Sequence, residues 1–225
     1  VVSVGYSKAP ENPYPSALND IYYVIKWFRE HDLEEKIDRE SFALMGFSAG
    51  ANLAAVISIM AKEKKDFSIA AQVLHYPYLD AVTPPSEKKR YPGDIPLEMM
   101  ELFVEYYSSE EQRKDYSVYP VFAQIEQLEG LEPTLIITAE DDALKDEGEK
   151  YYKMLTKADV DTEYETMPGA HHGYIEDWYN PAVYDAAPED KKNLHCNNFG
   201  DSAAKAIDKT VEFLSKKIGY YNELK

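Results

Sequence analysis

Residues 42–50, Phe42-Ala43-Leu44-Met45-Gly46-Phe47-Ser48-Ala49-Gly50, decide the fold of this chain. The apolar run 42–45 predicts a short buried strand, and residues 49–61 predict a helix. The Gly-x-Ser-x-Gly pattern between them is typical of a nucleophile elbow, which exposes a serine hydroxyl at a helix N-terminus. The glycines at 46 and 50 are expected to let strand and helix approach each other without a Cβ clash. In the alternative interpretation, Ser48 only caps the helix.

A serine nucleophile needs a histidine base and an acid that orients the base, and candidates for both follow later predicted strands. Residues 133–139 predict a buried strand that leads into Glu140-Asp141-Asp142. Residues 161–167 alternate as a strand does and lead into Pro168-Gly169-Ala170-His171-His172-Gly173. The candidates for the acid are Asp141 and Asp142, which in the alternative interpretation only form a solvated loop. Adjacent side chains of an extended loop point apart, so only one of His171 and His172 can face Ser48.

Five segments, in order along the chain, resemble motifs of the hormone-sensitive-lipase-like (GDXG) esterases. Residues 1–11 (VVSVGYSKAPE) resemble the strand and YRLAPE segment, and residues 46–53 (GFSAGANL) resemble the GDSAGGNL elbow. Residues 74–80 (LHYPYLD) resemble LIYPVLD, residues 139–148 (AEDDALKDEG) resemble AEYDPLRDEG, and residues 172–174 (HGY) resemble HGF. The resemblance is specific because the motifs keep their order over about residues 1–175.

The resemblance implies an α/β-hydrolase fold, with a mostly parallel sheet between helices in three αβα layers. It implies a serine hydrolase that cleaves carboxylic esters with short acyl chains and needs neither cofactor nor metal. By position, Ser48 is the nucleophile, Asp142 the acid and His172 the base, and the backbone N–H of Ala49 is an oxyanion-hole donor. Three alternatives stay open on this fold: a deacetylase of acetylated carbohydrates, a non-catalytic binding protein, and an inactive fragment.

The chain also departs from the family pattern. Phe47 replaces the usual acid beside the nucleophile and either lines an acyl pocket or packs, and Ala51 replaces a glycine. The chain contains no His-Gly-Gly sequence for a glycine-rich oxyanion loop, and it opens on Val1 inside a predicted strand. We therefore expect a chain that lacks N-terminal strands, hydrolyses esters slowly by itself, and self-associates or re-pairs its strand 1–6.

Composition limits the classes of partner. A chain of 225 residues with 44% hydrophobic residues can form one ordinary domain. Its formal net charge of −17 argues against nucleic acid and anionic membranes, because both are polyanions. The single cysteine and the absence of a long apolar run favour a cytoplasmic protein without a membrane span, although the starting residue leaves a signal peptide open. The expected partner is a small-molecule ester, and a homo-oligomer is possible.

The remaining pattern predicts one α/β-hydrolase domain over residues 1–225, in which strands and helices alternate. Besides the segments above, strands are expected at residues 1–6 and 69–76, and helices at 15–30, 97–107, 146–158 and 202–218. Prolines interrupt residues 81–132, which we interpret as an irregular excursion over the site. Within it, Lys88-Lys89-Arg90 is expected to be a solvated loop, and His75 is expected in the core.

Two further sets of residues carry weaker signals. Tyr174, Trp178 and Tyr179 follow the predicted base directly and are candidates for the rim of a pocket. His195 and Cys196 are adjacent potential metal ligands, but two ligands alone do not predict a metal site. The sequence predicts no role for residues 176–200.

Overall fold

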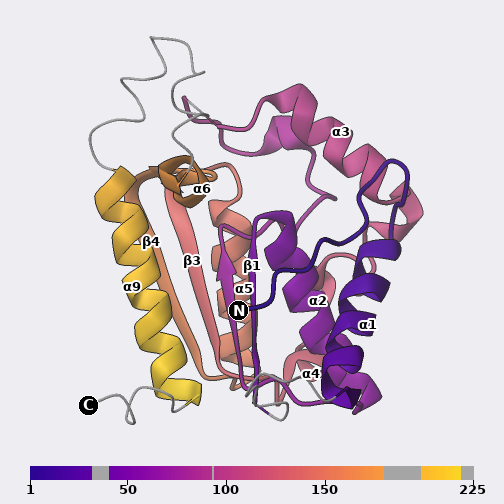
Figure 1. The fold of residues 1–225 in the computed structure, drawn as a ribbon. Coiled ribbons are helices and arrows are strands. Elements are labelled where there is room, and N and C mark those ends of the chain that lie inside the picture. The colour runs from indigo at the N-terminus through magenta and orange to yellow at the C-terminus, as the bar shows by residue number, and fades with distance from the viewer. Residues whose placement is uncertain (32–40, 93, 180–198, 219–225) are drawn as a thin grey trace.

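A computed structural model describes residues 1–31, 41–92, 94–179 and 199–218 of the chain (Figure 1). In these residues four strands form one parallel sheet in the order β1-β2-β3-β4. The strands are β1 (Ala43–Phe47), β2 (Ala71–His75), β3 (Thr134–Asp141) and β4 (Thr162–His171). The longer helices are α1 (Ser16–Glu30), α2 (Ala49–Lys64), α3 (Leu97–Tyr107), α5 (Lys145–Lys157) and α9 (Phe199–Ile218). A short helix, α6 (Tyr174–Tyr179), follows β4.

Helices cover both faces of the sheet because alternate strand residues point to opposite sides. Leu74 and Ile136 pack with residues of α2 and α5 on one face. Their sequence neighbours Val73 and Leu135 pack with residues of α9. Figure 1 shows α9 on the side of the sheet away from α2. The predicted fold class, a parallel sheet between helices in three αβα layers, is therefore confirmed.

The register of the sheet brings four loops to one edge. Phe47 is level with His75, His75 with Ile137, and Asp141 with His171. Because the strands are parallel, the residues that follow them all lie at the carboxyl edge, where open α/β sheets bind ligands. The nucleophile, acid and histidine segments of the sequence are therefore neighbours in space.

The predicted strand at residues 1–6 is wrong. The segment has no regular secondary structure, Val1 and Val2 are exposed, and the sheet order does not include it. Its alternating valines fit a strand pattern, but a strand also needs a hydrogen-bonded neighbour, which the sequence pattern does not specify. Tyr6 instead packs beside residues of α1 and α2.

An excursion of short elements joins β2 to β3. It contains α3, which has the predicted bounds, and four shorter helices: η1 (Pro85–Glu87), η2 (Glu110–Gln112), η3 (Pro120–Phe122) and α4 (Ile125–Leu128). In Figure 1, α3 lies at the same end of the sheet as α6, above the carboxyl ends of the strands. The excursion thus stands beside the edge where the predicted site residues meet.

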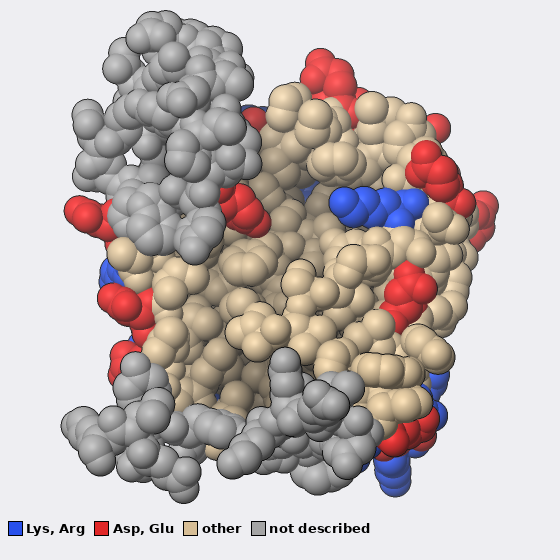
Figure 2. All heavy atoms as spheres, in the orientation of Figure 1, with Lys and Arg blue, Asp and Glu red and all other residues tan. Residues whose placement is uncertain are grey.

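The surface agrees with the acidic composition. In Figure 2, uncharged residues cover the middle of the face shown, and acidic side chains lie around its margin. Met45 of the edge strand β1 is 44% exposed.

Among the described residues, none of the helices combines the length and the apolar character that crossing a bilayer requires.

The two glycines of the elbow differ in what they permit. A Cβ added at Gly46 would lie 2.2 Å from the carbonyl oxygen of Gly50, so strand and helix touch there through backbone atoms. A Cβ at Gly50 would meet only the Tyr6 hydroxyl at 3.9 Å, which is an ordinary contact. The expectation that both glycines are needed for close approach therefore holds for Gly46 alone.

We predict that Gly46→Ala lowers the free energy of unfolding by more than about 2 kcal/mol, because backbone atoms have to move to admit the methyl group. Gly50→Ala is the matched control and should be neutral or slightly stabilising, since Gly in a helix is unfavourable relative to Ala. Urea denaturation of the two variants measures the difference. Equal stability of both variants would show that the contact at Gly46 does not limit packing.

Candidate active site

Ser48 occupies a strained turn between β1 and α2. Its φ of 51° and ψ of −117° lie in a region that non-glycine residues avoid, at a cost of roughly 1–3 kcal/mol. The Ser48 N–H donates to the carbonyl oxygen of His75 over 2.9 Å, and the Ser48 carbonyl accepts from Ala51 and Asn52 of α2. Its side chain makes no capping hydrogen bond to the helix, which contradicts the interpretation of Ser48 as a cap.

His172 lies between Ser48 and Asp142. Its Nε2 is 2.8 Å from Ser48 Oγ, and its Nδ1 is 2.9 Å from Asp142 Oδ2. The other oxygen of Asp142, Oδ1, accepts a hydrogen bond from the N–H of Leu144 over 2.9 Å. A carboxylate only accepts hydrogen bonds, so Nδ1 carries a proton and a neutral imidazole leaves Nε2 free to accept one from Ser48. The structure therefore joins these three side chains in one hydrogen-bonded chain.

The competing residues of the sequence lie elsewhere. Asp141 ends β3 and is level with His171 in the sheet. The Nδ1 of His171 is 2.6 Å from the carbonyl oxygen of His172, so this ring bonds to the backbone. Of the two acids and the two histidines that the sequence offered, the structure places Asp142 and His172 together with Ser48.

Two opposing effects act on the pKa of His172. Burial disfavours the charged imidazolium and lowers the pKa, whereas the hydrogen bond and the negative charge of Asp142 raise it. The charges of Glu176 and Asp94 act in the same direction as Asp142. Together these acids hold the pKa of His172 above its ordinary value of 6.5.

Tyr76, which sequence reasoning did not single out, forms a wall of the site. Its ring stands edge-on to the His172 ring, with centroids 5.1 Å apart at 69°. It follows β2 with a positive φ of 34°, and its hydroxyl donates to Glu176 of α6. Burial raises the pKa of this hydroxyl, so it stays protonated. The only feature of the sequence that could have pointed to Tyr76 as a site residue is its place between the end of a predicted strand and Pro77.

Several aromatic side chains near the site pack against other rings. Phe47 stacks on His75 with centroids 4.9 Å apart at 16°, and it packs toward the α9 core. His75 is fully buried, as expected, and burial lowers its pKa to about 4, so it is neutral. Tyr174 is buried against Tyr76 and does not form a rim.

The other weak candidates lie outside what the structure describes. The side chains of Trp178 and Tyr179, and both His195 and Cys196, lie outside the described part of the structure. Within the described part, no group of three or more His, Cys, Asp or Glu side chains is placed to hold a metal ion.

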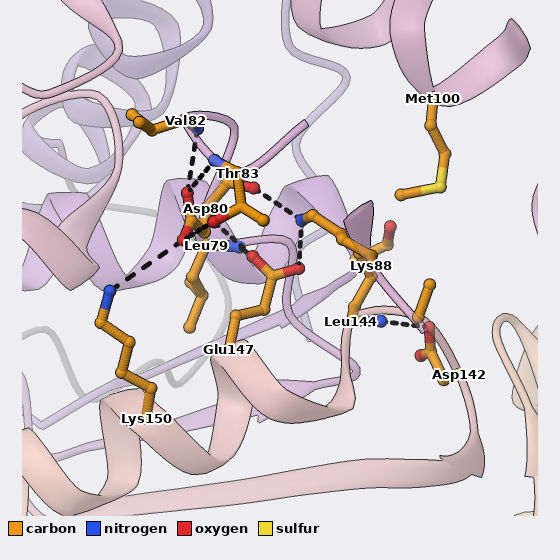
Figure 3. A network of polar contacts seen from close by, with 12 residues as sticks. Leu79, Asp80, Val82, Thr83, Lys88, Met100, Asp142, Leu144, Glu147 and Lys150 are labelled. Carbon is orange, nitrogen blue, oxygen red and sulfur yellow. Dashed lines mark hydrogen bonds and ion pairs between the residues drawn. The ribbon is translucent and has the colours of Figure 1, made fainter. Parts of the chain in front are cut away.

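A buried ion pair joins the excursion to the helix that follows the acid loop (Figure 3). Lys88 Nζ lies 2.8 Å from Glu147 Oε1, and both side chains are only 6% exposed. The expectation that Lys88 belongs to a solvated loop is wrong, because α5 supplies a carboxylate that the local sequence does not reveal. Burial raises the pKa of Glu147 to about 7, and the Lys88 ammonium opposes this rise.

Hydrogen bonds extend this pair to the segment after β2. Glu147 Oε2 accepts from the N–H groups of Leu79, over 2.8 Å, and Asp80. Lys88 Nζ also donates to the carbonyl oxygen of Asp80 over 2.6 Å. The Asp80 carboxylate in turn accepts from the backbone of Val82 and Thr83, as Figure 3 shows. The network thereby connects three segments that border the site.

Comparison with known proteins identifies the family. The sequence matches the alpha/beta hydrolase fold family over residues 1–176. It is 33% identical over 181 residues to carboxylesterase NlhH of Mycobacterium tuberculosis (strain CDC 1551 / Oshkosh), covering 78% of this chain and 56% of that protein. It is 33% identical over 178 residues to an arylesterase of Saccharolobus solfataricus, covering 78% of this chain and 58% of that protein.

Among solved structures, a thermostable esterase from Pseudomonas putida ECU1011 superposes with a TM-score of 0.78 at 29% identity. That alignment covers 95% of this chain and 62% of the esterase. The chain belongs to the alpha/beta hydrolase fold family, and its resemblance to the hormone-sensitive-lipase-like esterases is confirmed. The chain spans 56% and 58% of the length of the two curated relatives.

We predict that Glu147→Leu lowers the free energy of unfolding by about 3–5 kcal/mol, because it leaves the Lys88 ammonium buried without its partner. The double variant Lys88→Met/Glu147→Leu should lose less than Glu147→Leu alone, since no uncompensated charge remains. Chemical denaturation measures both.

Lys150→Met is the control for this prediction, because Lys150 is 49% exposed and 4.0 Å from Asp80. It should change stability by less than about 1 kcal/mol. A double variant no more stable than Glu147→Leu would contradict the assignment of the loss to the unpaired charge.

Proposed function

We propose that the full-length protein hydrolyses carboxylic esters through an acyl-enzyme on Ser48. The observation that carries the proposal is the hydrogen-bonded chain from Ser48 Oγ through the His172 ring to Asp142, with links of 2.8 and 2.9 Å. Relatives named carboxylesterase and arylesterase support it. A binding protein on this fold would not need these three side chains in hydrogen-bond contact.

The first step follows from the geometry of the ring. As Ser48 Oγ attacks the ester carbonyl carbon, its proton passes to Nε2 of neutral His172. Asp142 keeps the ring in the required tautomer and stabilises the imidazolium that forms. The negative charge that develops on the carbonyl oxygen lies near the start of α2, where the N–H of Ala49 is the proposed oxyanion donor.

The second half of the cycle reverses these roles. His172 gives its proton to the departing alcohol, and the acyl group remains on Ser48 Oγ. A water molecule then attacks the acyl carbon while His172 takes its proton, and the collapse of the intermediate releases the acid and restores Ser48. We propose small esters with short acyl chains as substrates, and aryl acetates are the natural first test.

We predict that Ser48→Ala and His172→Ala in the full-length protein each lower kcat for an aryl acetate by roughly 10⁴- to 10⁶-fold. Asp141→Asn and His171→Ala are the matched controls and should cost less than about tenfold, because Ser48 Oγ bonds to the His172 ring, whereas the His171 ring bonds to the backbone carbonyl of His172. Loss of turnover in His171→Ala, with near-normal turnover in His172→Ala, would reverse the assignment of the base.

A further inference from the structure

Asp94 places a second buried carboxylate beside the acid loop. It lies in the excursion, between η1 and α3, and its side chain is 1% exposed. Its Oδ1 accepts from its neighbour, the N–H of Ile95, over 2.9 Å. Its Oδ2 accepts from the N–H of Ala143 over 3.2 Å, and Ala143 directly follows Asp142. A side chain of the excursion thus holds the backbone of the loop that carries the acid.

Two consecutive N–H groups of this loop bond to two different carboxylates. Ala143 donates to Asp94, and Leu144 donates to Asp142. The bond from Ala143 ties the loop to the excursion, and the bond from Leu144 ties the loop backbone to the Asp142 side chain. Both bonds therefore restrict the position of the Asp142 carboxylate relative to the His172 ring. The Asp94 carboxylate is therefore placed to act on the site through the backbone of Ala143.

The charged groups that face Asp94 come from three segments. Arg90 of its own segment lies 3.7 Å away through its guanidinium, while Asp142 and His172 belong to the loops after β3 and β4. Burial and the negative charge of Asp142 raise the pKa of Asp94, and Arg90 and His172 oppose that rise. The Asp94 charge in turn raises the pKa of His172. Asp94 and His172 are therefore electrostatically linked.

We propose that Asp94 is a positioning residue that fixes the acid loop and adds a further negative charge in favour of protonated His172. The inference rests on the proposed function, in which His172 becomes positively charged when Ser48 attacks. A buried charge interacts more strongly than one in water, so the Asp94 carboxylate lowers the energy of that state. The two parts of the role are separable, because an amide can accept the Ala143 hydrogen bond but carries no charge.

The pH dependence of kcat/KM in the full-length protein tests the charge. For an aryl acetate, wild-type kcat/KM should rise with pH through a midpoint above 6.5, because only neutral His172 accepts the Ser48 proton. Asp94→Asn removes a negative charge and favours the neutral ring, so this midpoint moves to lower pH. At about pH 5.5 the variant should keep roughly 2- to 5-fold more of its plateau kcat/KM than the wild type keeps.

Two variants separate charge from position. Asp94→Ala also removes the acceptor for Ala143, so it should show the same displaced midpoint and a kcat lower by roughly tenfold. Asp146→Asn is the matched control, because it removes an exposed acid from the start of α5. Solvent screens that charge, and the midpoint should stay where the wild type has it.

A second readout does not need ester turnover. The protonation of His172 can be followed through the NMR chemical shifts of its ring in Ser48→Ala protein. The titration midpoint should move to lower pH when Asp94→Asn is added. If this titration is displaced but the wild-type protein hydrolyses no ester, the role of Asp94 is supported and the proposed function is refuted. An unchanged midpoint in Asp94→Asn, or an equal change in Asp146→Asn, would overturn the charge role. Failure of both Asp94 variants to fold would show a purely structural residue and would also overturn it.

Discussion

The site depends on the turn that holds Ser48 between β1 and α2. The residue adopts a positive φ that serine avoids, and the surrounding structure maintains it through the His75 carbonyl and the first turn of α2. The close approach of Gly46 to the backbone of Gly50 allows β1 and α2 to meet directly at this turn. A relaxed turn would direct the hydroxyl elsewhere, and the histidine would have no proton to accept.

The parallel sheet supplies the partners of that serine. Because β1, β2, β3 and β4 pair in sequence order, the loops after β3 and β4 end beside the elbow. The excursion after β2 then adds contacts from outside the sheet. Lys88 bonds to Glu147 of α5, and Asp94 bonds to Ala143 of the acid loop. The sheet brings Ser48, Asp142 and His172 together, and the excursion contacts α5 and the loop that carries Asp142.

Local sequence was sufficient to predict the elements whose cause is local. The elbow pattern predicted the turn at Ser48, and the apolar run before Glu140 predicted β3. The periodicity of residues 97–107 predicted α3 with its observed bounds. The order of strand-end residues, together with the family resemblance, singled out Asp142 and His172, which the structure places in hydrogen-bond contact.

Features that depend on distant partners were not predictable from one sequence. Residues 1–6 have a strand pattern, but pairing decides whether a strand forms, and the pattern contains no information on pairing. Lys88 looked solvated because its partner Glu147 is 59 residues away. Tyr76, Asp94 and Glu176 reach the site only through tertiary packing, and no motif distinguishes Asp94 from other loop acids.

The proposed activation of Ser48 by His172 is tested most directly by the reaction of the full-length protein with a fluorophosphonate, followed by mass spectrometry of the peptides. We expect one covalent adduct, on Ser48 Oγ in the wild type, and far slower labelling in His172→Ala. An adduct on another residue, or equally fast labelling of Ser48 without His172, would contradict it.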